Sequence, residues 1–257
     1  MSENYDGIEF KEVDRKKKVR KKKNYLLRFL IFVGILTAVA LFLSSGFFAI
    51  EKIDVQGNVY YSDEEVINIS GAQAGGNLFW GAGASEIRDR LGEDPYFAEV
   101  RVKRRLPDTL VIEVEERRQT AAIVYGDEYI VIDEQGIVLR KSDVDPKVTL
   151  LTGLTVSKMK PGEKIEVEES AILSSTLQML QVMTDGDIYF KKIDVSKTII
   201  RAYIYDTLLV KGTPRQMKDS IENGNLQKVV NNLFKNDTTR GTISLGNGKY
   251  MSFSPEF

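Results

Sequence analysis

Hydrophobic and polar positions form three kinds of pattern along this chain. An uncharged, largely apolar run covers residues 29–50, FLIFVGILTAVALFLSSGFFAI. After it, apolar residues recur at every second position in some segments and at every third and fourth position in others. A period of two predicts half-buried strands, and a period of 3.6 predicts amphipathic helices. The pattern therefore predicts one apolar helix followed by domains of mixed strands and helices, an α+β fold.

The apolar run is long enough to cross a membrane. About 22 helical residues reach roughly 33 Å, and the hydrocarbon core of a bilayer is about 30 Å thick. The preceding segment, residues 15–28, is strongly basic, and basic flanks stay on the cytoplasmic side. We therefore expect a disordered basic cytoplasmic tail at 1–24, a transmembrane helix at 25–49, and all later residues outside the cytoplasm.

Two other interpretations of this segment are weaker. A secretory signal peptide also has a basic region before an apolar one, but its apolar region is usually about 7 to 15 residues long. Ser44 and Gly46 are small enough to precede a cleavage point, yet Phe47 and Phe48 continue the apolar run beyond it. A basic cluster can bind nucleic acid, but its position beside a membrane span favours topology and contact with anionic lipid.

The first domain is expected at residues 50–119. Alternating apolar residues at 50–55 predict a strand that ends in a turn at Gly57. Ser62 and Glu65 have the spacing of a capping box, in which a serine caps a helix and a glutamate bonds back to it. The helix is expected to end near Gly71.

A glycine-rich segment at residues 71–85 follows this helix. Glycine-rich loops can cradle phosphate, but this one lacks the GxxxxGK[ST] and GxGxxG patterns. Leu78, Phe79 and Trp80 lie in its middle, which favours a loop anchored in the core. Ser85 is expected to cap a second short helix.

The most regular alternation lies at residues 97–118, FAEVRVKRRLPDTLVIEVEERR, and predicts an antiparallel hairpin. A two-residue turn at Pro107-Asp108 would pair charged residues with core residues. A three-residue turn, Pro107–Thr109, gives an apolar face and a face of opposite charges. The pairs predicted by this register are Leu106 with Leu110, Val102 with Val114, Lys103 with Glu113, and Arg101 with Glu115. Arg104 then falls on the inner face opposite Ile112.

A second, β-rich domain is expected at residues 120–257. Short strands separated by turns at Gly126 and Gly136 begin it, and helical spacing appears at 168–184 and at 214–235. Two short strands close the chain, with a turn at residues 246–248. Because a chain-terminal strand is often an edge strand, this region is a candidate for strand addition by a partner.

Composition limits the chemistry that the chain can perform. It contains 36 basic and 37 acidic residues, with no cysteine and no histidine. Disulfides, thiol nucleophiles, histidine-based zinc sites and the Ser-His-Asp triad are therefore excluded. Two carboxylate pairs remain, Asp133 with Glu134 and Glu113 with Glu115. The first lies in a turn and the second faces basic residues across the hairpin, so both are better explained as structural.

The strand, helix, helix, strand, strand order over about 70 residues beside a membrane span resembles a POTRA domain. More closely, the chain resembles the FtsQ/DivIB family of bacterial division proteins. The residues that carry the resemblance are Gly76-Asn-Leu-Phe79, Ile87, Leu91, Pro95, Val100-Arg-Val and Arg105-Leu-Pro-Asp-Thr-Leu-Val-Ile-Glu-Val-Glu-Glu-Arg117. The family has a proline and an alanine after its Glu-Arg; here Arg118, Gln119, Thr120 and Ala121 follow, and the proline is absent.

The resemblance implies a non-enzymatic scaffold without cofactors at the division septum, which links ring assembly to septal peptidoglycan synthesis. Its partners would be FtsL-like and DivIC/FtsB-like membrane coiled-coil proteins at the terminal strands, and other division proteins at the POTRA domain. The candidate contact residues are Thr242, Ile243, Leu245, Tyr250, Met251 and Phe253, which could equally face inward and seal the core. The alternatives are a POTRA module for polypeptide transport, or a membrane-anchored cell-wall enzyme.

Overall fold

The computed structural model describes residues 24–81, 83–183, 185–246 and 250–256, so most of the expected cytoplasmic tail lies outside the described residues. The chain divides into two compact units between Ser45 and Gly46. The first unit contains helix α1 (Tyr25–Leu43), which has no buried residue and a mean hydropathy of 2.6. By length and composition α1 can cross a membrane. It ends at Leu43, before the predicted residue 49, and a short 3-10 helix η1 (Gly46–Phe48) follows.

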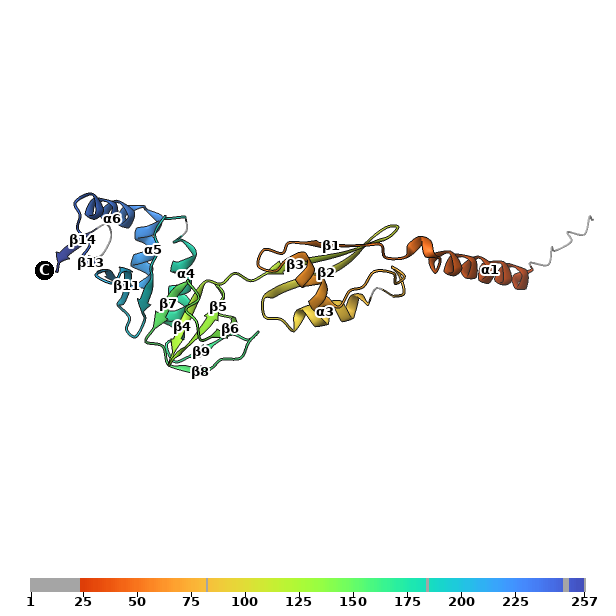
Figure 1. Ribbon diagram of the computed structural model, residues 1–257, viewed down its shortest axis with the longest axis horizontal. Helices are drawn as coiled ribbons and strands as arrows, with labels where there is room; N and C mark the ends of the chain where they lie inside the picture. The colour runs from red at the N-terminus through yellow and green to blue at the C-terminus, as the bar shows by residue number, and fades with distance from the viewer. Residues whose placement is uncertain (1–23, 82, 184, 247–249, 257) are drawn as a thin grey trace, which may run out of the picture. The chain divides into compact units, whose positions relative to one another are not determined.

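In the second unit, the five elements after η1 form the predicted POTRA order of strand, helix, helix, strand, strand (Figure 1). They are β1 (Lys52–Gln56), α2 (Asp63–Ser70), α3 (Ala84–Gly92), β2 (Phe97–Arg105) and β3 (Thr109–Glu116). The sheet order is β1-β3-β2, with β3 parallel to β1 and antiparallel to β2. The central strand β3 is therefore paired on both sides.

The helix ends follow their caps. Ser62 and Glu65 form the predicted capping box, and Gly71 ends α2 in the left-handed conformation, with φ 66°. The second helix begins one residue before Ser85, with Gly83 as its cap, so the prediction that Ser85 is the cap was wrong. Gly83 has a left-handed φ of 52°, which sets the start of α3 without a side-chain cap.

The register of the β2–β3 hairpin differs by two residues from the prediction. Arg105 pairs with Thr109, and Arg104 lies opposite Leu110 instead of Ile112, so the turn is Leu106–Asp108. The reason is tertiary: Thr109 also pairs with Lys52 of β1, which holds it in the ladder. A shift of two preserves the face of every side chain, so alternation alone cannot detect it. The predicted Lys103–Glu113 ion pair forms at 2.6 Å, whereas Arg101 pairs with Glu99.

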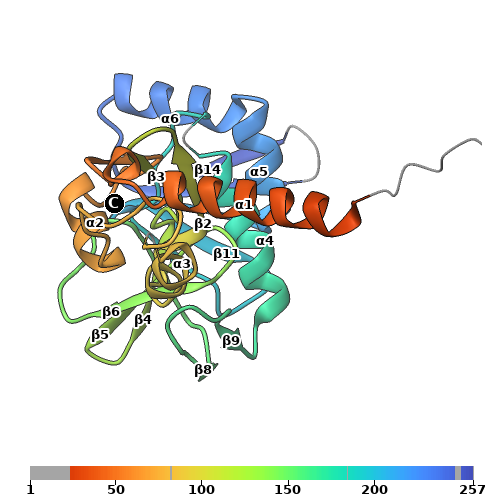
Figure 2. The same ribbon diagram turned by 90° about the vertical axis from the view of Figure 1, so that its right-hand side faces the viewer.

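The second domain is built on a nine-stranded sheet, ordered β14-β13-β12-β11-β10-β7-β4-β5-β6. Its strands, in chain order, are β4 (Ala121–Tyr125), β5 (Glu128–Ile132), β6 (Val138–Ser142), β7 (Thr149–Thr152), β10 (Lys192–Asp194), β11 (Ile200–Tyr205), β12 (Leu208–Gly212), β13 (Gly241–Leu245) and β14 (Met251–Pro255). A separate two-stranded sheet pairs β8 (Val156–Lys158) with β9 (Glu166–Val167). Helices α4 (Ser170–Gln181), α5 (Pro214–Glu222) and α6 (Asn225–Lys235) complete the domain (Figure 2).

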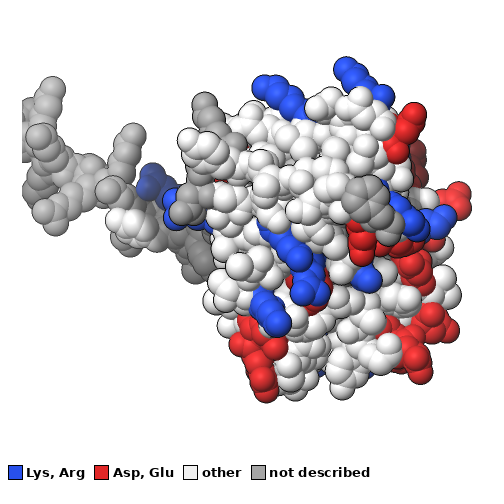
Figure 3. All heavy atoms as spheres, turned by 90° about the vertical axis from the view of Figure 1, so that its left-hand side faces the viewer, with Lys and Arg blue, Asp and Glu red and all other residues white. Residues whose placement is uncertain are grey.

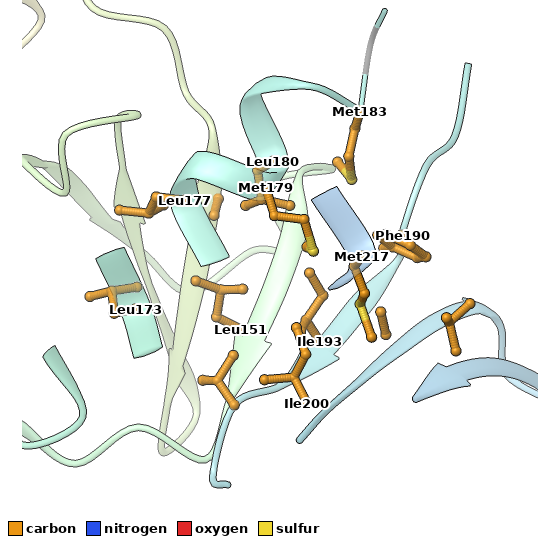
Figure 4. Packing of buried hydrophobic residues seen from close by; sticks show 14 of the residues in the cluster. Leu151, Leu173, Leu177, Met179, Leu180, Met183, Phe190, Ile193, Ile200 and Met217 are labelled. Atoms are coloured by element: carbon orange, nitrogen blue, oxygen red, sulfur yellow. The ribbon is translucent and has the colours of Figure 1, made fainter. Parts of the chain in front are cut away.

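The main core lies between the sheet and these helices. Figure 4 shows Met179 of α4 and Met217 of α5 directed toward Ile193 and the neighbouring strands, and Leu177 of α4 belongs to the same cluster. The helical spacing in the sequence therefore correctly predicted which face of each helix is buried.

The other face of β4, β5 and β6 packs against an aromatic residue of the first domain. Tyr96 is 4% exposed and clusters with Ala122, Val131 and Leu139. Its hydroxyl accepts hydrogen bonds from Gln119 and Arg140, and burial raises the pKa of Tyr96 to about 12. Burial at this contact therefore favours the neutral form of the Tyr96 hydroxyl.

We expect Ile193→Ala to lower the free energy of unfolding by about 2 to 5 kcal/mol, because it leaves a cavity at a fully buried position. Ile199 is 61% exposed, so Ile199→Ala is the matched control and should change stability by less than about 0.5 kcal/mol. Urea unfolding of the detergent-solubilised chain, followed by far-UV circular dichroism, measures both. Equal losses in the two variants would contradict this core assignment.

Candidate partner-binding edge

The nine-stranded sheet ends at β14. This strand is antiparallel to β13, and β13 is parallel to β12 on its other side. Of the two closing strands predicted from the sequence, only β14 is therefore an edge strand, and β13 is internal. The opposite end of the sheet is partly covered: Val138 of β6 donates to the Glu163 carbonyl and accepts from the Gly162 N–H.

The order of elements explains why β13 is internal. The chain leaves β12, forms α5 and α6, and returns as β13, which is the strand–helix–strand crossover that gives parallel neighbours. Thr213 caps α5 in a capping box with Gln216, whose side-chain amide also donates to the Gly246 carbonyl at 3.2 Å. The crossover and the end of β13 are thus held by the same residue.

Gly241 allows β14 to lie close to β13. Its φ is +139°, a conformation that favours glycine, and an added Cβ would lie 2.5 Å from the Ser254 carbonyl oxygen and 2.7 Å from the Phe253 ring. Phe253 pairs with Ile243, so the ring occupies the space beside the glycine. A side chain at residue 241 would force β14 away from the sheet.

The candidate contact residues fall into three groups by exposure. Ile243 is completely buried in the core, so its side chain is unavailable to a partner. Thr242 and three apolar residues are half-buried, and the apolar ones pack on the core; these are Leu245, Met251 and Phe253. Tyr250, at 82% exposure, is the most accessible of the six. Burial separates contact candidates from core residues, which alternation in the sequence could not do.

The backbone of β14 points outward at two of these residues. Gly246 N–H donates to the Tyr250 carbonyl, and in an antiparallel ladder the bonded positions alternate. The N–H and C=O groups of Met251 and Phe253 are consequently turned away from β13. Among the described residues, no backbone hydrogen bond reaches this outer side of β14. Pro255, which has no N–H, ends the strand.

The side of the molecule that carries this edge has a mixed surface. Figure 3 views the side on which α6 and β14 lie; uncharged atoms cover most of it, with lysine and arginine across the middle and acidic groups toward the margins. Phe234 of α6 packs edge-on against Tyr205 nearby in the same domain, with ring centroids 5.5 Å apart. The uncharged part of this side offers room for contact with apolar groups of a partner.

One member of each carboxylate pair weighed from the sequence is engaged in structural bonds. Asp133 is 2% exposed; one of its oxygens accepts the N–H groups of Gln135 and Ile137, and the other is 2.8 Å from Arg117. Glu113 pairs with Lys103. Both residues line an open cleft of about 1020 Å³. Among the described residues, no group of three or more acidic side chains is arranged to hold a metal ion.

Comparison with known proteins adds two findings. Residues 48–117 match the POTRA domain family, FtsQ-type. The cell division protein DivIB of Clostridium acetobutylicum is 30% identical over 184 residues, which cover 68% of this chain and 72% of that protein. DivIB of Bacillus subtilis strain 168 is 21% identical over 81% of this chain and 77% of its own length. FtsQ of Syntrophotalea carbinolica is 27% identical over 77% and 71%.

We expect Gly241→Ala to lower the free energy of unfolding by about 1 to 3 kcal/mol, because alanine is strained at this φ and its Cβ meets the Ser254 carbonyl. Gly92 has open space around its Cα, so Gly92→Ala is the control and should be neutral or stabilising by up to about 1 kcal/mol. Urea unfolding gives the stability, and limited proteolysis reports release of β14. A Gly241→Ala protein as stable and as resistant as the control would show that β14 does not require this glycine.

Proposed function

Because the chain belongs to the DivIB/FtsQ family of cell division proteins, we propose that it acts as a non-enzymatic scaffold at the division septum. It binds membrane-anchored coiled-coil division proteins of the FtsL and DivIC/FtsB type. The observation that carries the proposal is the open side of β14, with outward backbone groups at Met251 and Phe253.

The proposed mechanism is strand addition. A partner segment in extended conformation bonds to the outward N–H and C=O groups of β14, and its alternate side chains lie beside the half-buried Met251 and Phe253. Main-chain bonds supply affinity, and the apolar rim selects apolar residues at every second position of the partner. Exposed Tyr250 adds a large amphipathic contact at one end of the strand.

The proposed placement follows from α1 and its flanks. α1 spans the cell membrane once, the basic segment before it stays in the cytoplasm, and residues 46–257 are extracytoplasmic. Partners that are themselves membrane-anchored then meet this chain in two dimensions, which raises their effective concentration. The POTRA domain provides a second surface for other division proteins.

Phe253→Pro tests the backbone edge. Proline removes an outward N–H and its ring blocks an added strand, while the bonds of β14 to β13 at the neighbouring positions remain. We expect affinity for a DivIC/FtsB-type partner, measured by co-purification and titration, to fall about tenfold or more. Phe253→Ala removes the ring but keeps the N–H, and should weaken binding less.

Ser252→Pro is the third variant of this set. The Ser252 N–H points toward β13, so the loss of this N–H destabilises the sheet itself. Normal binding by a folded Phe253→Pro protein would remove the β14 backbone from the mechanism. Equal losses in Phe253→Pro and Phe253→Ala would assign binding to the aromatic ring instead.

Localisation tests the division role. A fluorescently tagged full chain should form bands at midcell in dividing cells, because its proposed partners assemble there. Uniform membrane fluorescence throughout division would contradict the septal placement. Sustained release of peptidoglycan fragments by the purified chain would contradict the scaffold proposal and would indicate an enzyme.

A further inference from the structure

Three large apolar side chains are exposed at one end of the POTRA domain. They are Phe47 of η1, Trp80 of the glycine-rich loop and Leu106 of the β2–β3 turn, at 63%, 66% and 61% exposure. We call these three residues the apolar tip. They come from segments up to 59 residues apart in the sequence, so neither periodicity nor a single motif groups them.

Hydrogen bonds join the three segments that carry the apolar tip. Leu78 N–H donates to the Phe48 carbonyl at 2.8 Å, and Glu51 N–H donates to the Asp108 carbonyl at 2.9 Å. Arg104 of β2 donates its Nε–H to the Leu78 carbonyl at 2.7 Å, which connects the hairpin to the glycine-rich loop.

Buried neighbours hold each exposed residue in place. Leu78 is fully buried, Phe48 is 6% exposed, and the Phe48 and Phe79 rings meet edge to face at 5.2 Å. The core therefore anchors residues 48 and 78, and leaves Phe47 and Trp80 directed to the outside. Three large apolar groups held at fixed positions on the surface are typical of a contact surface.

The chain itself limits how far the apolar tip lies from the bilayer that α1 is proposed to cross. The 19 residues of α1 span about 28 Å, close to the thickness of the hydrocarbon core, so Leu43 lies at its boundary. Phe47 is four residues later, which is at most about 14 Å of extended chain. Trp80 and Leu106 belong to segments bonded to residues 48 and 51, immediately beyond Phe47.

We propose that the apolar tip inserts into the headgroup region of the membrane and fixes the POTRA domain on the bilayer surface. This inference rests on the proposed membrane span. Tryptophan is enriched at membrane interfaces, where its large ring lies at the level of the headgroups. The exposed Arg104 adds guanidinium donors that suit lipid phosphate oxygens.

Charges near the apolar tip are balanced. Lys52, Arg104 and Arg105 lie close to Glu51, Asp54 and Asp108, and Arg105 pairs with Asp54 at 3.1 Å. The contact therefore depends on apolar insertion and not on attraction to anionic lipid. Because α1 already holds the domain at the surface, weak insertion is enough to keep it docked.

Trp80 is the only tryptophan in the chain, so its fluorescence reports directly on the apolar tip. The experiment uses the full chain reconstituted in phosphatidylcholine vesicles, with and without phosphatidylglycerol, and lipids brominated near the headgroup or deep in the acyl chain. We expect blue-shifted emission and quenching by shallow bromine about twofold or more above quenching by deep bromine, as for an interfacial tryptophan. The two lipid compositions should give similar values.

The control moves the fluorophore to the second domain, in a Trp80→Phe, Tyr125→Trp protein; Tyr125 is at the end of β4 and is 42% exposed. This protein should show no lipid quenching, and Leu106→Glu should reduce quenching of Trp80 without releasing the chain from vesicles. Quenching of Trp80 no greater than that of the control would overturn the proposal. Blue-shifted emission without lipid quenching would also overturn it, in favour of a protein contact. Vesicle flotation measures the span separately, so failure of the anchor is distinguishable from failure of the apolar tip.

Discussion

Every strand in a sheet presents backbone donors and acceptors on two sides, and a sheet that does not close must end somewhere. In this protein the two edge strands of the nine-stranded sheet differ in how far the chain covers them. At β6 the chain folds back, and Gly162 and Glu163 bond to Val138. At β14 the described chain supplies no such cover, and only Pro255 limits the length of the edge. The asymmetry makes β14 the end at which a second chain can continue the sheet.

Much of the fold is readable from local signals. The capping box at Ser62 and Glu65, the spacing of α4 and the crossover between β12 and β13 each depend on residues close in sequence. The same crossover would have identified β14 as the edge, because a strand–helix–strand unit places its two strands side by side in parallel. Burial of Ile243 was not readable, since an alternating strand does not reveal which face the helices cover.

The hairpin shows where local reasoning fails. Two registers that differ by two residues keep the same faces, so the choice between them comes from β1, more than 50 residues earlier, which pairs with Thr109. That pairing moves Leu106 from a predicted core pair into the turn, where it is exposed. Likewise, the glycine-rich loop is anchored through Leu78, while Trp80, two residues later, faces out. The apolar tip is thus a product of tertiary pairing, and sequence periodicity could not have revealed it.

The two proposed contacts have complementary physical requirements. Strand addition at β14 demands that a partner segment approach in extended form and with a defined direction, which is an entropic cost for a flexible chain. This cost is lower when both proteins are anchored in the membrane, because they are then restricted to one surface. The reduction requires that the domains keep a narrow range of orientations. A POTRA domain that rotated freely about residues 44 and 45 would lose much of this advantage. The proposed docking of Phe47, Trp80 and Leu106 on the bilayer restricts this rotation. An interfacial contact that is too weak to anchor the protein can therefore still strengthen its assembly with its partners.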